Sequence, residues 1–527
     1  MRDPADLPPE LFDYIIDFAI CDPKATPKQL CQLSLVNHRW HSFVLPHIYA
    51  KWTYDGAAHS FSSLWSFAIT VLRNPRIASM VRTLVIGNWG FNQYEATGEE
   101  FRHSFHDSEY IREAIRPVSI SELEEQIFRD LSRGDCRPLV AVLLTCLPNI
   151  TMIEAHVPRS DPVLGAVLQW ALERQRSARK SDGTAPKPPA PLARLKSLRL
   201  WGEVHVEADS NSDDTLLFLH DIWPVLCFPG LEVLRLSEID VEGVRALLQK
   251  LGMDRGSSSV QHLTISCYDN TRGTSEDLQA LLDIFTRLKS FSFYCVDPKW
   301  YGPKRDDSKR CIRNPDLWTF LARHRETLEY LDIFRKQTGG SREMGRLGPL
   351  TDFTRLTHLC IQPDVLFGAG DTADASLLPP LKESLPLTSS SALQHLTIDC
   401  ISSNKLLGIL DIYSDPRENI LLNKTLPALK ALRLHDMAHL DVLEPEPGWE
   451  PFRRALEKSG ITVGFDSGNC RHPDHLLMPG GKLPRGGTCP ALWRESFEMQ
   501  VRGKARWQEV MDLIDLRDYS EYSGECY

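Results

Sequence analysis

The stretch Leu231-Glu232-Val233-Leu234-Arg235-Leu236 contains the pattern that decides the fold of this chain. Leucine occupies its first, fourth and sixth places, and a polar residue separates the last two leucines. Alternate side chains of a β-strand point to opposite faces, so Leu234 and Leu236 share one face and Arg235 lies on the other. The pattern therefore predicts a strand that buries one of its faces.

The same hexad recurs along the chain at irregular steps of 36, 29, 28, 40, 28, 37 and 36 residues. Stretches of helical periodicity, such as residues 241–251, 278–285 and 317–321, lie between copies. Strands that alternate with helices must run parallel, with the helices on the outer side. The eight clear copies occupy residues 195–200, 231–236, 260–265, 288–293, 328–333, 356–361, 393–398 and 429–434, and weaker copies occupy 81–86, 147–155 and 461–465.

This repetition resembles a leucine-rich-repeat array, whose unit is L-x-x-L-x-L followed by a helix. The steps exceed the roughly 20–29 residues of regular repeats. The Asn or Cys expected three places after the last leucine is also absent, although Cys267, Cys295 and Cys400 stand one place early. The resemblance therefore implies an irregular solenoid of parallel strands with outer helices. A doubly wound α/β domain with similar strands is the alternative.

A second informative stretch is Leu7-Pro8-Pro9-Glu10-Leu11-Phe12-Asp13-Tyr14-Ile15-Ile16, followed by Leu30-Cys31-Gln32-Leu33-Ser34-Leu35-Val36-Asn37-His38-Arg39-Trp40. The prolines suit the start of a helix, where a missing N–H has no cost. A short helix that is apolar on two faces cannot bury both within a small module, so one face is available to a partner. Its two apolar stripes are Leu11, Ile15 and Phe18, and Phe12, Ile16 and Ala19.

These roughly fifty residues resemble an F-box, the helical module that joins a protein to a Skp–cullin ubiquitin ligase. The resemblance rests on Leu-Pro-x-Glu, the Ile-Ile pair and the Leu-Val-x-x-x-Trp ending. The alternative is an ordinary helical hairpin packed on the rest of the protein. The resemblance implies that the Skp adaptor binds through Leu7, Pro8, Leu11, Ile15, Ile16, Leu33, Val36 and Trp40.

The sequence thus predicts an α/β protein with an all-α F-box at residues 1–52. Residues 53–190 hold the first irregular repeats, a polar helical insertion and a Pro-rich loop. The spacing of apolar residues within 52–73 predicts an amphipathic helix. Residues 191–465 form the repeat solenoid, and 466–527 form a C-terminal loop and helix.

Composition indicates a globular intracellular protein, placed in the cytoplasm, the nucleus or both. Of 527 residues, 42% are hydrophobic and 25% charged, which suffices for a packed core. The formal charge of −10 disfavours nucleic acid as the main partner. No apolar run reaches the ~18 residues of a membrane span, so no membrane partner is expected. Thirteen cysteines among apolar neighbours are typical of reduced, buried thiols.

No motif of an enzyme is found. The chain lacks a phosphate-binding loop, a dinucleotide glycine fingerprint, H-E-x-x-H and G-x-S-x-G, and no cofactor is predicted. The weak candidates for zinc ligands are Cys470, His472, His475 and Cys489. Because no second Cys-x-x-Cys pair accompanies them, no metal site is predicted.

The face of the predicted strands opposite the leucines is the candidate binding surface, since the concave face of a solenoid usually binds the partner. Large aromatic groups on such a face dominate interface energetics. The alternative is that a loop, such as residues 363–391, covers them. The face includes Ser197, Arg199, His262, Ser292, Asp332, Gln362, His395 and His435, and the candidate target-binding residues are Trp201, Arg235, Tyr294, Tyr330, Phe334, His358, Asp399 and Arg433.

Together the two resemblances imply the substrate-recognition subunit of a Skp–cullin–F-box ubiquitin ligase. The adaptor, and through it a cullin–RING ligase, would bind the F-box, and an unknown target protein would bind the repeats. The chain itself would catalyse nothing. The alternatives are a non-degradative F-box and repeat scaffold, and a zinc-binding C-terminal domain.

Overall fold

The computed structural model describes a large part of the chain, which forms two compact units. The first holds the described residues up to 202 together with Phe228–Leu231, and the second holds 217–227 and 232–466. The described residues are 8, 10–11, 14–15, 27–56, 59–87, 89–90, 105–118, 123–158, 161–180, 190–202, 217–237, 239–253, 256–268, 274–296, 312–336, 344–362, 365–366, 392–399, 427–435, 454 and 456–466.

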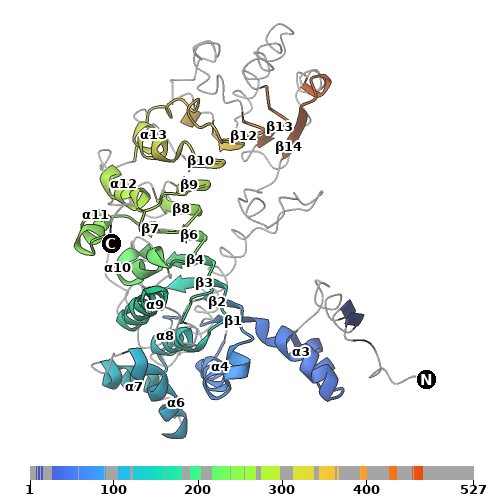
Figure 1. Ribbon diagram of the computed structural model, residues 1–527, viewed down its shortest axis with the longest axis vertical. Helices are drawn as coiled ribbons and strands as arrows, with labels where there is room; N and C mark the ends of the chain where they lie inside the picture. The colour runs from blue at the N-terminus through green and yellow to red at the C-terminus, as the bar shows by residue number, and fades with distance from the viewer. Residues whose placement is uncertain are drawn as a thin grey trace, which may run out of the picture. The chain divides into compact units, whose positions relative to one another are not determined.

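The first unit combines four parallel strands in the order β1-β2-β3-β4 with helices on the connections (Figure 1). The strands are β1 (Lys51–Asp55), β2 (Thr83–Gly87), β3 (Met152–Val157) and β4 (Ser197–Gly202). The helices are α2 (Pro27–Ser34), α3 (His38–Ala50), α4 (Phe61–Arg73), α5 (Pro75–Ala78), α6 (Phe105–Ile115), α7 (Glu124–Ser132), α8 (Arg137–Cys146) and α9 (Pro162–Lys180).

Strand β1 corrects the prediction of one helix over residues 52–73. Only α4 is helical there, whereas Lys51–Asp55 pairs in parallel with β2. The β-favouring Trp52 and Tyr54 lie on one face of this strand; Tyr54 is buried, and Trp52 stacks on Phe67 with ring centroids 3.9 Å apart. Packing against α4 therefore outweighs any local helical preference.

The polar helical insertion predicted within residues 53–190 contains the helices α6 and α7. Arg73 at the end of α4 pairs with Asp107 and lies over the Tyr110 ring, 5.0 Å from its centroid. Ile127 and Leu131 of α7 are buried. These contacts attach the insertion to the first unit.

The second unit repeats a strand and its connection along the order β6-β8-β9-β10-β11-β12-β13-β14, all parallel. Its strands are β5 (Leu217–Phe218), β6 (Val233–Ser237), β7 (Ile239–Asp240), β8 (His262–Tyr268), β9 (Ser290–Val296), β10 (Tyr330–Lys336), β11 (His358–Ile361), β12 (His395–Asp399), β13 (Ala431–His435) and β14 (Thr462–Asp466). Its helices are α10 (Leu219–Ile222), α11 (Val244–Lys250), α12 (Ser275–Asp283) and α13 (Asn314–Leu321).

The predicted hexads are confirmed as parallel strands in register. All eight lie on strands, from β4 to β13, and the three weaker copies form β2, β3 and β14. Within the second unit the fourth place of each hexad faces the fourth place of the next, as Leu263 faces Phe291 and Phe291 faces Leu331. The three predicted helical stretches form α11, α12 and α13.

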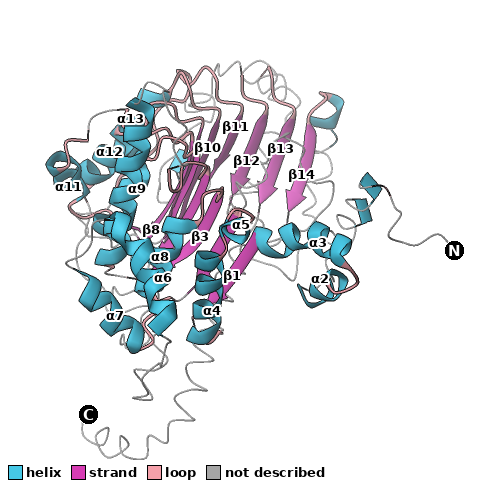
Figure 2. Ribbon diagram, turned by 60° about the horizontal axis from the view of Figure 1, so that its bottom comes forward, coloured by secondary structure: helices cyan, strands magenta, loops and turns pink. Residues whose placement is uncertain are grey.

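The core of the second unit lies between the leucine face of its strands and the helices α11, α12 and α13 (Figure 2). Phe291 and Phe293 of β9 are fully buried on this face. Helix α12 contributes Leu278 and Leu281 at helical spacing. It begins at a capping box, in which Thr274 and Asp277 bond each other's backbone N–H groups.

A backbone ladder runs along the second place of the hexads. The N–H of Gln261 donates to Glu232 O at 2.9 Å, and that of Lys289 donates to Gln261 O at 2.8 Å. The same bond continues from Glu329, Thr357, Gln394, Lys430 and Thr462. This ladder fixes one repeat against the next in a chain that lacks the Asn side chains expected of regular repeats.

In the part of the chain that the structure describes, no helix has both the length and the apolar character needed to cross a membrane.

Candidate functional site

The polar face of the second unit, defined as the sheet face opposite the leucines, carries three rows of side chains set by strand register. The first row runs through His262, Ser290, Tyr330, His358 and His395. The second runs through Arg235, Thr264, Ser292, Asp332, Cys360 and Thr397, and the third includes Ser266, Tyr294 and Phe334.

A buried carboxylate lies at the centre of this face. Asp332 Oδ2 accepts hydrogen bonds from the hydroxyl of Tyr294 at 2.7 Å and from that of Tyr330 at 3.3 Å. Asp332 is 2% exposed. Burial, with a smaller contribution from the Asp332 charge, raises the pKa of Tyr330 well above its usual value, so Tyr330 stays a hydroxyl donor.

Two polar groups of this cluster have no hydrogen-bond partner among the described residues: the second carboxylate oxygen of Asp332, Oδ1, and the Oγ of Ser292. Ser292 is fully buried, and its Cα is the register partner of the Asp332 Cα on the neighbouring strand. Unpaired buried polar atoms cost about 1–3 kcal/mol each, so their occurrence side by side marks the cluster as a candidate binding site.

The first row contains a stacked histidine pair. The rings of His358 and His395 lie 4.3 Å apart between centroids and are parallel to within 6°. Burial, followed by the proximity of His395, lowers the pKa of His358 to about 4. His358 is therefore neutral at pH 7, and the hydroxyl of Thr357 lies 2.8 Å from its Nδ1. Burial lowers the pKa of His262 in the same row.

The candidate target-binding residues differ in their exposure to solvent. Arg235, Tyr294 and Phe334 are buried, so of the two alternatives left open by the sequence these three side chains are covered rather than exposed. Tyr330 and His358 are partly exposed. Side chains of neighbouring strands meet across such a face, which spacing in sequence does not show. Most of the loop 363–391, the alternative cover, lies outside the described residues.

Two other predicted target-binding residues, Asp399 and Arg433, lie on β12 and β13, where the backbone is described. Trp201 belongs to β4 in the first unit, is partly exposed, and meets His156 edge to face at 5.8 Å. Beside it, Arg199 pairs with Glu154 of β3 at 2.8 Å. Burial lowers the pKa of His156 to about 4.

Sequence reasoning placed Ser292, Asp332 and Gln362 on the polar face but did not single them out. Gln362 accepts a hydrogen bond from the backbone N–H of Arg335. The alternation of side chains along a strand predicts the sheet face on which each residue lies. Only the register of β9 and β10 brings Ser292 beside Asp332.

The proposed adaptor-binding residues lie partly within the described residues. Helices α2 and α3 pack against each other, and Asn37 caps α3 by accepting from the Trp40 N–H at 3.0 Å. Between them, Leu35 is 82% exposed and Val36 is 61% exposed. Leu11 and Ile15 are helical and 48% and 40% exposed.

Of the remaining adaptor residues, Pro8 is exposed, and Leu33 and Trp40 are partly exposed. Leu7 and Ile16 lie outside the described residues. Burial of such an exposed apolar residue against a partner stabilises the complex by about 25 cal/mol per Å² of apolar surface removed from water.

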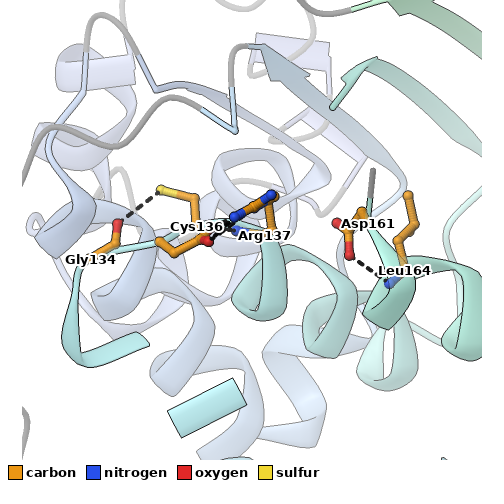
Figure 3. A network of polar contacts seen from close by, with 6 residues as sticks. Gly134, Cys136, Arg137, Asp161 and Leu164 are labelled. Atoms are coloured by element: carbon orange, nitrogen blue, oxygen red, sulfur yellow. Dashed lines mark hydrogen bonds and ion pairs between the residues drawn. The ribbon is translucent and has the colours of Figure 1, made fainter. Parts of the chain in front are cut away.

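Polar contacts lie at the starts of α8 and of α9 in the first unit (Figure 3). Arg137 pairs with Asp135 at 2.6 Å, and Asp161 Oδ1 accepts from the Leu164 N–H at 2.9 Å, which caps α9. Hydrogen bonding to Asp135 outweighs burial and raises the pKa of Arg137. The sulfur of Cys136 lies 3.2 Å from the Tyr54 hydroxyl. These contacts support the fold.

No cluster of three or more His, Cys, Asp or Glu side chains that could hold a metal occurs among the described residues. The zinc candidates Cys470, His472, His475 and Cys489 lie outside those residues.

No protein-family model matches this chain, and a search of curated proteins found no match.

Proposed function

We propose that the chain is the substrate receptor of a Skp–cullin–F-box ubiquitin ligase, with an F-box at its N-terminus and an irregular leucine-rich-repeat-like solenoid behind it. The observation that carries this proposal is the exposed pair Leu35 and Val36 between α2 and α3. Val36 belongs to the Leu-Val-x-x-x-Trp ending of the F-box resemblance, and its exposure suits a residue that becomes buried on the adaptor.

The repeating strands support the second half of the proposal. Parallel strands in continuous register form an extended face, and such faces hold protein partners in repeat proteins. A target held there comes close to the enzyme that transfers ubiquitin, and proximity is the whole contribution of this chain.

Co-purification of the full chain with the Skp adaptor of its host tests the proposal. The double variant Leu35→Asp with Val36→Asp should lose the adaptor, because a charge buried in an apolar contact is costly. The control Gln32→Asp adds a charge at an exposed polar position of α2 and should retain binding.

Leu11→Asp with Ile15→Asp tests the first helix in the same way. If both double variants still bind the adaptor as the wild type does, the F-box interpretation fails. If the wild type itself does not bind, the opening helices have another role.

A further inference from the structure

The carboxylate of Asp332 is buried without a cation. Among the described residues no ion pair to it is found, and its hydrogen bonds come from the two tyrosine hydroxyls. A buried charge that lacks a counter-charge costs several kcal/mol. A cationic partner from outside the chain would remove this cost.

The geometry of the remaining acceptors selects the kind of cation. Asp332 Oδ2 is already occupied by two hydroxyls, which leaves only Oδ1, with Ser292 Oγ on the next strand. A guanidinium binds a carboxylate best through both oxygens, whereas an ammonium is a compact point charge that needs single acceptors. The site therefore favours lysine over arginine.

Aromatic side chains surround the carboxylate. Tyr330 and Phe334 are two residues before and after Asp332 on the same face, and Tyr294 is the register partner of Phe334 on β9. The methylene stem of a lysine packs well on such rings, and its ammonium is attracted to them.

Tyr330 is the group that can open the site. Its hydrogen bond to Asp332, at 3.3 Å, is longer than the usual range for two oxygen atoms, whereas the bond from Tyr294 is 2.7 Å. Tyr330 is also partly exposed, whereas Tyr294 is buried. An entering ammonium would displace the Tyr330 hydroxyl first.

We propose that Asp332, Ser292, Tyr294 and Tyr330 form a recognition site for one lysine side chain of the target protein. The site deepens the proposed function, on which it rests, because it names the chemistry that the polar face recognises.

Binding of three blocked pentapeptides to the full-length protein tests this inference. The peptides are Ala-Ala-X-Ala-Ala, with lysine, arginine or norleucine at X, and affinities are measured by titration calorimetry and saturation-transfer NMR. We expect the lysine peptide to bind at least about tenfold more tightly than the other two.

Three variants connect this binding to the site. Asp332→Asn should weaken the lysine peptide at least about tenfold, because it removes the charge. Tyr330→Phe should strengthen it several-fold, because it removes the competing hydroxyl. The control Thr397→Val lies on the same row two strands away and should change nothing.

Equal binding of the lysine and arginine peptides, undiminished binding by Asp332→Asn, or no binding of the lysine peptide to the wild type would each overturn the inference. If Asp332→Asn does not fold, two other variants test the site. Ser292→Ala should weaken binding of the lysine peptide, and Tyr330→Phe should strengthen it. Adaptor co-purification is independent of these titrations. A chain that binds the adaptor but no lysine peptide overturns this site alone, and the reverse result overturns only the F-box proposal.

Discussion

The hydroxyl of Tyr294 on β9 lies 2.7 Å from Oδ2 of Asp332 on β10, and this bond joins two neighbouring strands across their buried polar face. The two residues are 38 positions apart in the sequence. The bond satisfies one oxygen of a carboxylate that is 2% exposed. It therefore links the stability of this unit to the arrangement of its candidate binding site.

Tyr294→Phe should lower the free energy of unfolding by about 1.5–3 kcal/mol, because a hydrogen bond to a buried charged group is lost. Tyr330→Phe, which removes the longer bond of a partly exposed residue, should cost less than about 1 kcal/mol. Urea unfolding followed by circular dichroism measures both. Equal losses in the two variants would contradict the ranking by bond length.

The stability of the second unit should depend on pH through His358. Its pKa in the folded chain is about 4, below its ordinary value of 6.5, so the unfolded chain binds the proton more readily. Stability from this group is therefore complete above pH 6.5 and falls as the pH drops towards 4. For a partly exposed ring the loss should be about 1–2 kcal/mol.

Urea unfolding at pH 5 and pH 7 checks this dependence. His358→Gln should reduce the difference between the two pH values, although the buried His156 and His324, with pKa values of about 4, also contribute to it. An unchanged difference in the variant would show that His358 is protonated equally in both states.

Thr274→Ala should lower the free energy of unfolding by about 1 kcal/mol, because it removes the side-chain cap of α12. The matched control is Ser60→Ala at the N-cap of α4, where the side chain makes no capping bond. The control should be within about 0.5 kcal/mol of the wild type. Similar losses at both positions would remove capping as the cause.

Gly348→Ala should destabilise the second unit by about 1–3 kcal/mol through overpacking. A Cβ at this position would lie 2.5 Å from the ring of Trp318, whose Nε1–H donates to Pro349 O at 2.8 Å. Displacement of that ring should also change the tryptophan fluorescence. At the control position, Gly87→Ala, the nearest atoms are 3.8 Å away, so it should be tolerated far better.

The strands and their direction could be predicted from local hydrophobic spacing. Each hexad places leucines or their equivalents on one side of a strand, and helical stretches between hexads leave only parallel pairing. These are local properties of hydrophobic spacing, and for that reason α11, α12 and α13 could also be predicted. Strand β1 escaped prediction, because its five residues follow α3 directly and pair with a strand some thirty residues later.

The contacts on the opposite face could be learned only from the folded arrangement of the strands. The sequence showed that Asp332 and Ser292 point away from the leucines, but not that Tyr294 and Tyr330 converge on one oxygen of that carboxylate. It left open whether Arg235, Tyr294 and Phe334 are exposed to a partner or covered, and they are buried. The physical reason is that the spacing within one strand fixes the direction of a side chain, whereas its neighbours and its burial depend on the register between strands that lie far apart in the chain.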